Sequence, residues 1–171
     1  DLLPPGLDEQ ALAEWIEAEV GYRRLTLVGL HLVSSKRGDG MRAAQSWITS
    51  GRLYQACRGL GVAKRCLDMA AKYAKQRVTF GAPLAERQAV QFMIADSYME
   101  HHMTQLLVYQ LAARTDAGVA ARHESYMAKI KGTELGFRVA DRCMQIHGGM
   151  GLANEMPIAK MWRDARSFMI T

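Results

Sequence analysis

The sequence predicts an all-α fold, an up-and-down bundle of long helices joined by short loops. Apolar residues recur every three or four positions over long stretches, which is the spacing that places them on one face of a helix. Alternating runs of β-branched residues, which would predict strands, are absent from the sequence. Glycine and proline gather between the periodic stretches and mark the loops. Because short loops make consecutive helices antiparallel neighbours, these observations together predict a helical bundle.

The first predicted helix covers about residues 8–34, after a lead-in that contains proline and glycine. Asp8 is suited to cap its start. The apolar stripe of this helix consists of Leu12, Trp15, Ile16, Val20, Leu27, Leu30 and Val33. A polar break with two glycines at 34–40 ends it, so we separate an N-terminal helical segment, 1–37, from a bundle at 38–171. The origin of that segment is open, and its stripe requires a partner within this bundle or on another subunit.

The second predicted helix begins near Met41 and runs to about Gln76. Each glycine inside an exposed helix costs about 1 kcal/mol relative to alanine. Three glycines within eleven positions therefore predict close packing against another backbone: Gly51, Gly59 and Gly61. A turn at 79–83, where glycine and proline stand together, separates this helix from the next.

The third predicted helix covers about 86–115, and 116–121 form a short loop after it. The apolar residues that we expect to face inward on this helix are Val90, Met93, Ile94, Met103, Leu106, Leu107 and Leu111. The fourth helix is expected at about 122–146, followed by a loop at 147–157. The last helix begins near Pro157, because proline suits the first turn of a helix.

The composition indicates a folded chain with a buried core. The 171 residues, of which 49% are hydrophobic and 23% charged, are enough for one domain or for the last third of a larger enzyme. The formal net charge is +5, but the basic residues are spread along the chain, which does not favour nucleic-acid binding. Eleven methionines suit the core of a bundle or the wall of a ligand site, and we favour the core.

The cysteines and the termini bear on the compartment. Cys57, Cys66 and Cys143 are too few and too scattered for a disulfide scaffold, which favours a reducing compartment. The apolar runs are too short to span a bilayer, so no membrane span is expected. The N-terminal stretch is acidic and has no signal-peptide core, which argues against a transit or signal peptide.

Several common chemistries lack their sequence signatures. No glutamate has a histidine three residues later, as a di-iron bundle requires. His101 and His102 are adjacent and therefore point to different helix faces, so no metal site is expected from them. Neither the Gly-x-Ser-x-Gly elbow nor the phosphate-binding loop with Gly-Lys-Ser/Thr occurs.

The first segment that stands out is Arg-Val-Thr-Phe-Gly-Ala-Pro-Leu-Ala-Glu-Arg-Gln over 77–88. A basic residue ends a helix and a glycine turn follows at once, so the Arg77 guanidinium is held at a corner where it can bind a phosphate. Phe80 offers an apolar ring to a flat partner. The structural alternative is an arginine that complements the helix dipole and a phenylalanine in the core.

The second segment is Gln-Ile-His-Gly-Gly-Met-Gly over 145–151. Paired glycines allow a backbone to approach a ligand closely, and their amides can bind anionic oxygens. The structural alternative is an ordinary helix C-cap with a tight turn. His147 is more often a hydrogen-bonded structural histidine than a catalyst.

Together with Asn-Glu-Met-Pro-Ile-Ala-Lys-Met-Trp-Arg-Asp-Ala-Arg at 154–166, these segments resemble the C-terminal helical domain of the acyl-CoA dehydrogenases. The similarity extends upstream, where Ala-Ala-Lys-Tyr-Ala-Lys-Gln-Arg at 70–77 follows that domain's approach to the arginine turn. It covers about residues 38–171, and three motifs in the family's order are far more specific than any one.

The resemblance implies a flavoprotein that removes the α and β hydrogens of an acyl-CoA thioester. In that family a carboxylate takes the α proton and N5 of FAD receives the β hydride. FAD is therefore the implied cofactor, acyl-CoA the implied substrate and an electron-transfer flavoprotein the implied partner. The resemblance also implies a homo-oligomer, a dimer or tetramer, with each FAD at a subunit interface to which this domain contributes.

The resemblance also implies individual roles. Arg77 would meet the FAD pyrophosphate, with Thr79 and Phe80 beside it. Gln88 would contact the adenosine side, and Arg52 matches an arginine that lines the acyl-CoA site. The backbone that would wrap the nucleotide belongs to Gln145, Ile146, His147, Gly148 and Gly149.

Three departures from the family pattern concern catalysis. The usual catalytic carboxylate falls on the position just past Thr171, and the alternative base position on the earlier helix is Gly51, which has no side chain. A family aspartate that helps to hold the substrate matches Thr49. The family's N-terminal helical and central β domains have no counterpart in the sequence. We therefore name no catalytic residue, and we expect the 171-residue chain to be inactive alone with acyl-CoA and an artificial electron acceptor.

Two functions remain open from the sequence. The first is the C-terminal domain of an FAD-dependent acyl-CoA dehydrogenase, in a bacterial cytoplasm or a mitochondrial matrix. The second is a non-catalytic helical module for self-association or partner binding. Bound flavin near Arg77 and Gly148 is the observation that separates them.

Overall fold

The computed structural model describes residues 40–170, and the predicted helix at 8–34 lies outside them. Within the described residues the fold is helical, as expected, with two strands of two residues each. The chain divides into two units after Ile48, and the packing described below is that of the second unit. The elements are α3 (Gly40–Gln76), β1 (Val78–Thr79), β2 (Ala82–Pro83), η2 (Leu84–Glu86), α4 (Gln88–Asp116), α5 (Arg122–His147), α6 (Gly149–Leu152) and α7 (Ile158–Phe168).

The predicted helix boundaries agree closely with the observed ones for α3, α4 and α5. The turn expected at 79–83 is confirmed, and it closes an antiparallel hairpin in which Thr79 pairs with Ala82. The sequence did not predict the two short strands of this hairpin or the short helix α6, which lies in the segment expected to be a loop at 147–157. Both elements are too short to produce a periodic signal in the sequence.

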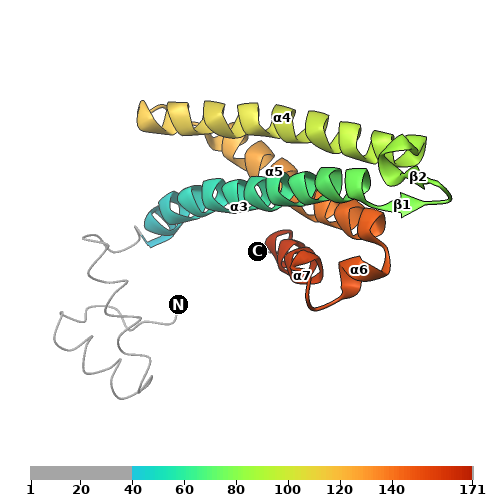
Figure 1. Cartoon of the computed structure of the whole chain (residues 1–171). Coiled ribbons are helices and arrows are strands. Elements are labelled where there is room, and N and C mark those ends of the chain that lie inside the picture. Colours follow the sequence, from blue (N-terminus) through green and yellow to red (C-terminus); the bar gives the residue numbers. More distant parts are fainter. Residues whose placement is uncertain (1–39, 171) are drawn as a thin grey trace, which may run out of the picture. The chain divides into compact units, whose positions relative to one another are not determined.

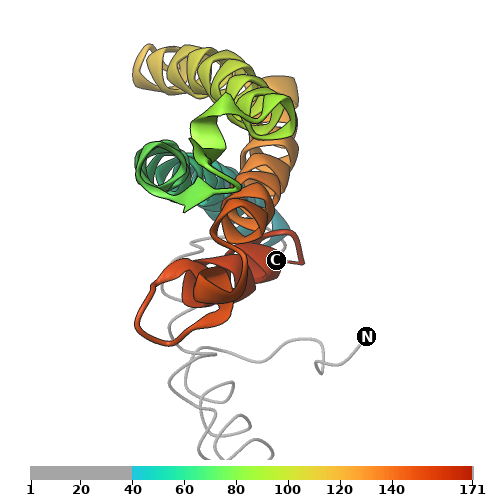
Figure 2. The ribbon, with the colours of Figure 1, turned by 45° about the vertical axis from the view of Figure 1, so that its right-hand side comes forward.

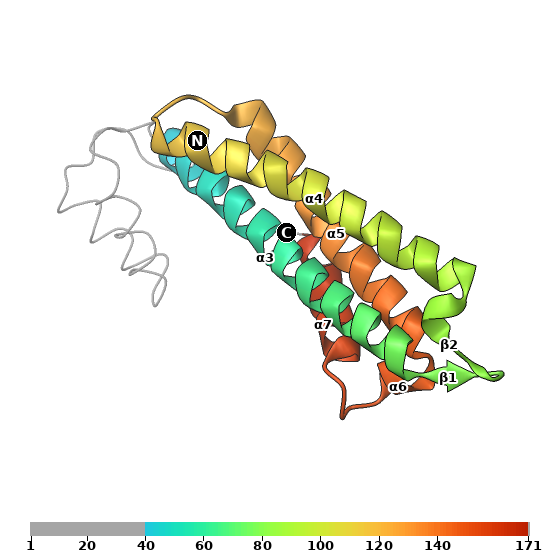
Figure 3. The ribbon, with the colours of Figure 1, turned by 45° about the horizontal axis from the view of Figure 1, so that its top comes forward.

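Helix α5 is the centre of the described unit. It packs against α4 and α7, and it also contacts α3 (Figure 1). Turned about the vertical axis, the ribbon shows α5 between α4 and the α6–α7 segment (Figure 2). Helices α3 and α5 end close to each other, near the hairpin and α6 (Figure 3). The ends of two helices that are far apart in the sequence are therefore brought together.

The α3–α5 contact is made by glycine and alanine backbones. A Cβ atom added at Gly132 would lie 2.7 Å from Cα of Ala56, and one added at Gly136 would lie 2.9 Å from Cα of Gly59. A Cβ at Gly59 would overlap the carbonyl oxygen of Gly132. The predicted backbone approach is thus confirmed at Gly59. It is wrong at Gly51 and Gly61, where an added Cβ would meet nothing within 4 Å.

The buried core consists of small and branched apolar side chains. The methionines of the described residues fit the expected core role only in part. Five of them are half-buried and pack against the core, and the others are exposed. The core residues with less than a tenth of their surface exposed include Ala56, Leu60, Ala63, Cys66, Val108, Leu111, Leu135, Val139, Cys143 and Ile158.

Helix α4 departs from the predicted inward face at two residues of its middle turns. Met103 and Leu106 are 62% and 57% exposed, although the apolar pattern places them inward. At the other predicted positions the expectation is confirmed: Leu111 is buried, and the residues that pack against the core include Val90, Met93, Ile94 and Leu107. Ser97, Thr104 and Val108 are buried as well, although the apolar pattern did not include them. Ser97 and Thr104 can be buried because their hydroxyls donate to helix carbonyls one turn back, those of Met93 and Glu100.

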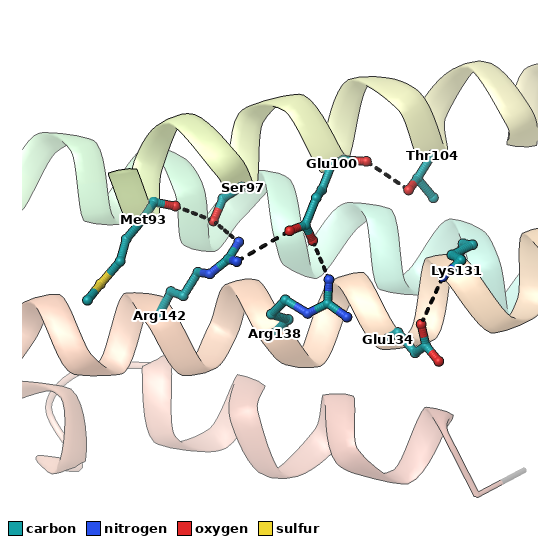
Figure 4. A network of polar contacts seen from close by, with 8 residues as sticks. All are labelled: Met93, Ser97, Glu100, Thr104, Lys131, Glu134, Arg138 and Arg142. Carbon is teal, nitrogen blue, oxygen red and sulfur yellow. Dashed lines mark hydrogen bonds and ion pairs between the residues drawn. The ribbon is translucent and has the colours of Figure 1, made fainter. Parts of the chain in front are cut away.

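A polar network joins α4 to α5 (Figure 4). Arg138 donates to one carboxylate oxygen of Glu100 at 2.8 Å, and Arg142 donates to the other at 3.3 Å. Arg142 also donates to the hydroxyl of Ser97 at 3.1 Å. One carboxylate thus holds two guanidinium groups from the facing helix.

We expect Glu100→Gln to lower the free energy of unfolding by about 1 kcal/mol, because it leaves two arginines without their counter-charge at a partly buried position. The matched control is Glu134→Gln, which removes the more exposed ion pair with Lys131 and should change stability by a few tenths of a kcal/mol at most. Urea unfolding of the full chain measures both. Equal effects of the two substitutions would contradict a role for the network.

Candidate nucleotide-binding groove

A groove of about 610 Å³ opens where α3 and α5 end. Its walls come from the last turn of α3, the hairpin, and the turn between α5 and α6. Seven of the nine residues assigned to the cofactor from the sequence line it. The lining residues are Tyr73, Arg77, Thr79, Leu84, Gln145, Ile146, His147, Gly148, Gly149 and Met150.

Arg77 stands at the corner between α3 and the hairpin. Its amide donates to the carbonyl of Tyr73 at 2.9 Å, and its carbonyl accepts from the amide of Leu84 at 2.8 Å. The backbone of Arg77 is therefore fixed on both sides. Its side chain is exposed, and within residues 40–170 the guanidinium makes no hydrogen bond or ion pair. All of its donors are available to a ligand.

The hairpin places an aromatic side chain entirely in solvent. Phe80 and Gly81 have φ angles of 51° and 79°, the left-handed conformations of a tight hairpin turn. Phe80 is 99% exposed, so the alternative that it belongs to the core is wrong. Arg87 donates from Nη2 to the carbonyl of Thr79 at 2.9 Å and braces the hairpin against the start of α4.

The opposite wall is the chain reversal after α5. Gly148 has a φ of 58° and a ψ of −136°, a conformation that side chains rarely adopt. A Cβ at Gly148 or Gly149 would meet nothing within 4 Å, so both positions open onto free space. The backbone angles at position 148 require glycine. Because neither Gly148 nor Gly149 has a side chain, this part of the groove wall consists of backbone alone.

His147 is the buried residue of the groove lining that carries an imidazole. The residue is only 4% exposed, and its ring stacks on Tyr73 with a centroid distance of 4.1 Å and an interplanar angle of 22°. Its Nδ1 lies 2.8 Å from the carbonyl oxygen of Cys143. The interpretation as a hydrogen-bonded structural histidine agrees with these contacts.

Cys143, which contacts His147, carries an unreactive thiol. Cys57, Cys66 and Cys143 are all free thiols, and the last two are buried. A hydrogen bond to Cys66, together with burial, holds the pKa of the Cys143 thiol far above its usual range. Cys143 therefore stays protonated and does not act as a nucleophile.

Three residues assigned from the sequence lie outside the groove. Phe80 projects from the hairpin tip, and Gln88 is exposed at the first position of α4. Arg52 is 25 residues before Arg77, about 37 Å away along α3 at about 1.5 Å per residue. The Arg52 guanidinium lies 4.5 Å from the centroid of the Tyr126 ring.

Three residues that the sequence did not single out also line the groove: Tyr73, Leu84 and Met150. Tyr73 was within reach of the sequence, because it lies four residues before Arg77 and thus on the same side of the helix end. Leu84 begins η2 and Met150 belongs to α6, and both elements are too short to leave a periodic signal in the sequence.

The groove favours an anion. Arg77 is the one charged residue among the lining residues, and no carboxylate is present among them. The described residues also contain no group of three or more histidine, cysteine or acidic side chains that could hold a metal ion. The arrangement can bind and orient an anionic ligand, but it contains no carboxylate that could act as a base.

A second groove, of about 680 Å³, lies between α3 and α4 and contains none of the residues assigned from the sequence. Its floor is apolar, with Leu67, Ala71 and Ile94. His101 lies at the edge of this second groove. Desolvation by burial is the main cause that lowers the pKa of His101, and the positive charge of Lys64 is the second cause.

Residues 38–171 match the family described as acyl-CoA dehydrogenase, C-terminal domain. The chain belongs to the acyl-CoA dehydrogenase family. The match includes all the residues of the groove and agrees with the resemblance that the arginine turn and the paired glycines indicate.

Relatives within the family share more than a third of the aligned residues. The chain is 40% identical over 131 residues to the CarC subunit of the caffeyl-CoA reductase–Etf complex of Acetobacterium woodii, covering 77% of this chain and 35% of that protein. It is 38% identical over 129 residues to the mitochondrial short-chain specific acyl-CoA dehydrogenase of Bos taurus, covering 75% and 31%. Butyryl-CoA dehydrogenase from Megasphaera elsdenii superposes with a TM-score of 0.77 at 34% identity, covering 79% and 35%.

The chain therefore spans about a third of the length of these relatives. In the part of the chain that the structure describes, no helix is both long and apolar enough to cross a bilayer.

Proposed function

We propose that the chain is the C-terminal domain of an FAD-dependent acyl-CoA dehydrogenase and that its groove holds the pyrophosphate of FAD. The observation that carries this proposal is the convergence of an unpaired guanidinium at Arg77 and a bare glycine wall at Gly148 and Gly149 in one groove. A fork of N–H donors suits a phosphate, and the absence of carboxylates from the lining removes the main source of repulsion.

The residues that line the groove fit a pyrophosphate. The open space over Gly148 and Gly149 admits a ligand directly against the backbone, which any larger side chain would fill. Thr79 and Gln145 add polar groups to the two walls. Phe80 and Gln88, which lie outside this groove, are assigned to other parts of the same cofactor.

The function that we assign to the domain is binding and orientation. When bound, FAD supplies hydride acceptance in the α,β-dehydrogenation of acyl-CoA. Arg77 holds the cofactor by its phosphates, and the rigid turn at Gly148 limits its position. Arg52 is assigned to the acyl-CoA site, where its place over the Tyr126 ring keeps the guanidinium in a fixed direction.

The partner implied for the electrons is an electron-transfer flavoprotein. The CarC subunit to which this chain is similar is described as part of a complex with Etf. The mitochondrial and bacterial relatives support a matrix or bacterial cytoplasmic location.

An exposed apolar face on α4 supports a homo-oligomer. Phe92, Met99, Met103 and Leu106 are each more than half exposed and recur at the spacing of one helix face. An exposed apolar patch of this kind marks an interaction surface. We assign it to contact with another subunit.

We expect Met103→Glu to shift the protein toward a smaller assembly, because a buried unpaired carboxylate in the contact costs several kcal/mol. The control is Ile130→Glu, a substitution at a half-exposed apolar residue on α5. Light scattering after gel filtration measures the mass. An unchanged mass for the Met103 variant would contradict the assignment of this face.

The test of the proposed function is flavin content. Purified protein incubated with excess FAD and separated from free ligand should retain the visible absorbance of bound flavin. Assembled protein that retains no flavin would contradict the proposal and favour the non-catalytic helical module.

A further inference from the structure

The tautomer of His147 is determined by its neighbour in the chain. Nδ1 lies 2.8 Å from the carbonyl oxygen of Cys143, and a carbonyl oxygen can only accept. Nδ1 must therefore carry the hydrogen. In a neutral imidazole the other nitrogen, Nε2, is then an acceptor with a free lone pair.

The orientation of the ring is fixed as well. Tyr73 stacks on it at a centroid distance of 4.1 Å, and the residue is buried, so the ring cannot turn freely. Within residues 40–170, Nε2 has no hydrogen-bond partner. It is not sealed in the core either, because the buried side-chain polar atoms without a partner are Nε of Arg114 and Oγ of Ser125. His147 is one of the residues that line the groove, so the groove is where a ligand would reach its ring.

We propose that His147 presents Nε2 as a fixed acceptor to a hydroxyl group of the ligand in the groove. The inference rests on the proposed function and deepens it. A phosphate offers only acceptors to a neutral imidazole, so it is bound by Arg77, whereas the neighbouring Nε2 requires a hydrogen-bond donor, which a hydroxyl beside the phosphate supplies. The groove thus selects a phosphate that is linked to a sugar or sugar alcohol with a free hydroxyl, the combination that FAD offers on both sides of its pyrophosphate.

The first experiment determines the tautomer without a ligand. In a long-range proton–nitrogen correlation spectrum of the full chain with isotope-labelled histidine, at mildly alkaline pH, His147 should show a protonated Nδ1 and an unprotonated Nε2. The exposed His123 should show the mixture typical of free imidazole. A hydrogen on Nε2 of neutral His147 would overturn the inference whether or not the protein binds FAD.

The second experiment measures ligand binding to His147→Phe, which keeps a flat ring against Tyr73 but has no acceptor. Affinity for ADP, which carries the ribose, and for FMN, which carries the ribityl chain, is measured separately by calorimetry. We expect a loss of roughly three- to tenfold for at least one of them, the size of one neutral hydrogen bond. His123→Phe is the control and should change neither.

The outcomes separate this inference from the proposed function. A loss confined to ADP assigns the donor to the ribose, and a loss confined to FMN assigns it to the ribityl chain. If both ligands bind the wild type and the His147 variant equally, while an Arg77 variant loses them, the groove binds phosphate and the role of His147 is overturned. If neither ligand nor FAD binds the wild type, the proposed function fails and the hydroxyl contact fails with it.

Discussion

Gly59→Ala should lower the free energy of unfolding by about 3 kcal/mol, the largest effect that we expect from adding a single methyl group to this chain. The added Cβ would overlap the carbonyl oxygen of Gly132, which is backbone and cannot swing aside. Helices α3 and α5 would have to separate, and the contact between Gly136 and Gly59 would open with them. Packed interiors yield little to such an insertion, because few voids exist to receive the displaced atoms.

Gly61→Ala is the matched control, two residues further along the same helix. Gly61 is exposed and an added Cβ there would meet nothing within 4 Å. Alanine should therefore raise stability by about 0.5–1 kcal/mol, through its better helix propensity. Urea unfolding of both full-length variants, monitored by circular dichroism, should move their midpoints in opposite directions. If both variants were more stable than the wild type, the backbone contact between α3 and α5 would be refuted.

Arg77→Ala should weaken FAD binding by roughly 10- to 100-fold, the loss of a charge-assisted and forked hydrogen bond. The guanidinium has no partner among residues 40–170, so its removal leaves no other group of the described chain unpaired. The effect should therefore fall on binding and spare stability. Arg77→Lys should recover part of the affinity, because it keeps the charge but not the planar fork.

Lys75→Ala controls for general electrostatics. Lys75 is exposed, two residues before Arg77, and it lines the other groove, between α3 and α4. Quenching of FAD fluorescence on binding gives the affinities. A similar loss from both substitutions would show that net charge rather than the arginine corner attracts the cofactor. A lower unfolding midpoint for the Arg77 variant would mean that the side chain serves the fold.

The long helices could be predicted because each carries its signal over many turns. Helices α3, α4 and α5 were found within about two residues at each end. The hairpin and α6 were missed because they contain too few residues for a period. The prediction that Met103 and Leu106 face inward on α4 was wrong. Hydrophobic periodicity cannot distinguish a helix face that packs on the core from a second apolar face that remains exposed.

The site was predictable where a residue is chemically unusual for its position. An arginine before a glycine turn and a glycine pair after a helix stand out in any sequence, and the structure brings Arg77 and Gly148 into one groove. Tyr73 was missed because an aromatic residue near a helix end is ordinary until its stacking partner is known. The acceptor role of His147 depends on a 2.8 Å contact, which no spacing in the sequence reveals.

The contact between the glycine backbones of α3 and α5 has a further consequence for the groove at the ends of these helices. Backbone held against backbone has no rotamers through which the spacing could adjust. The two walls are therefore preorganised: a ligand of the right width meets them already in place and loses little affinity to ordering them. The same rigidity limits the size of the ligand that the groove can bind, because a bulkier group could enter only if α3 and α5 separated.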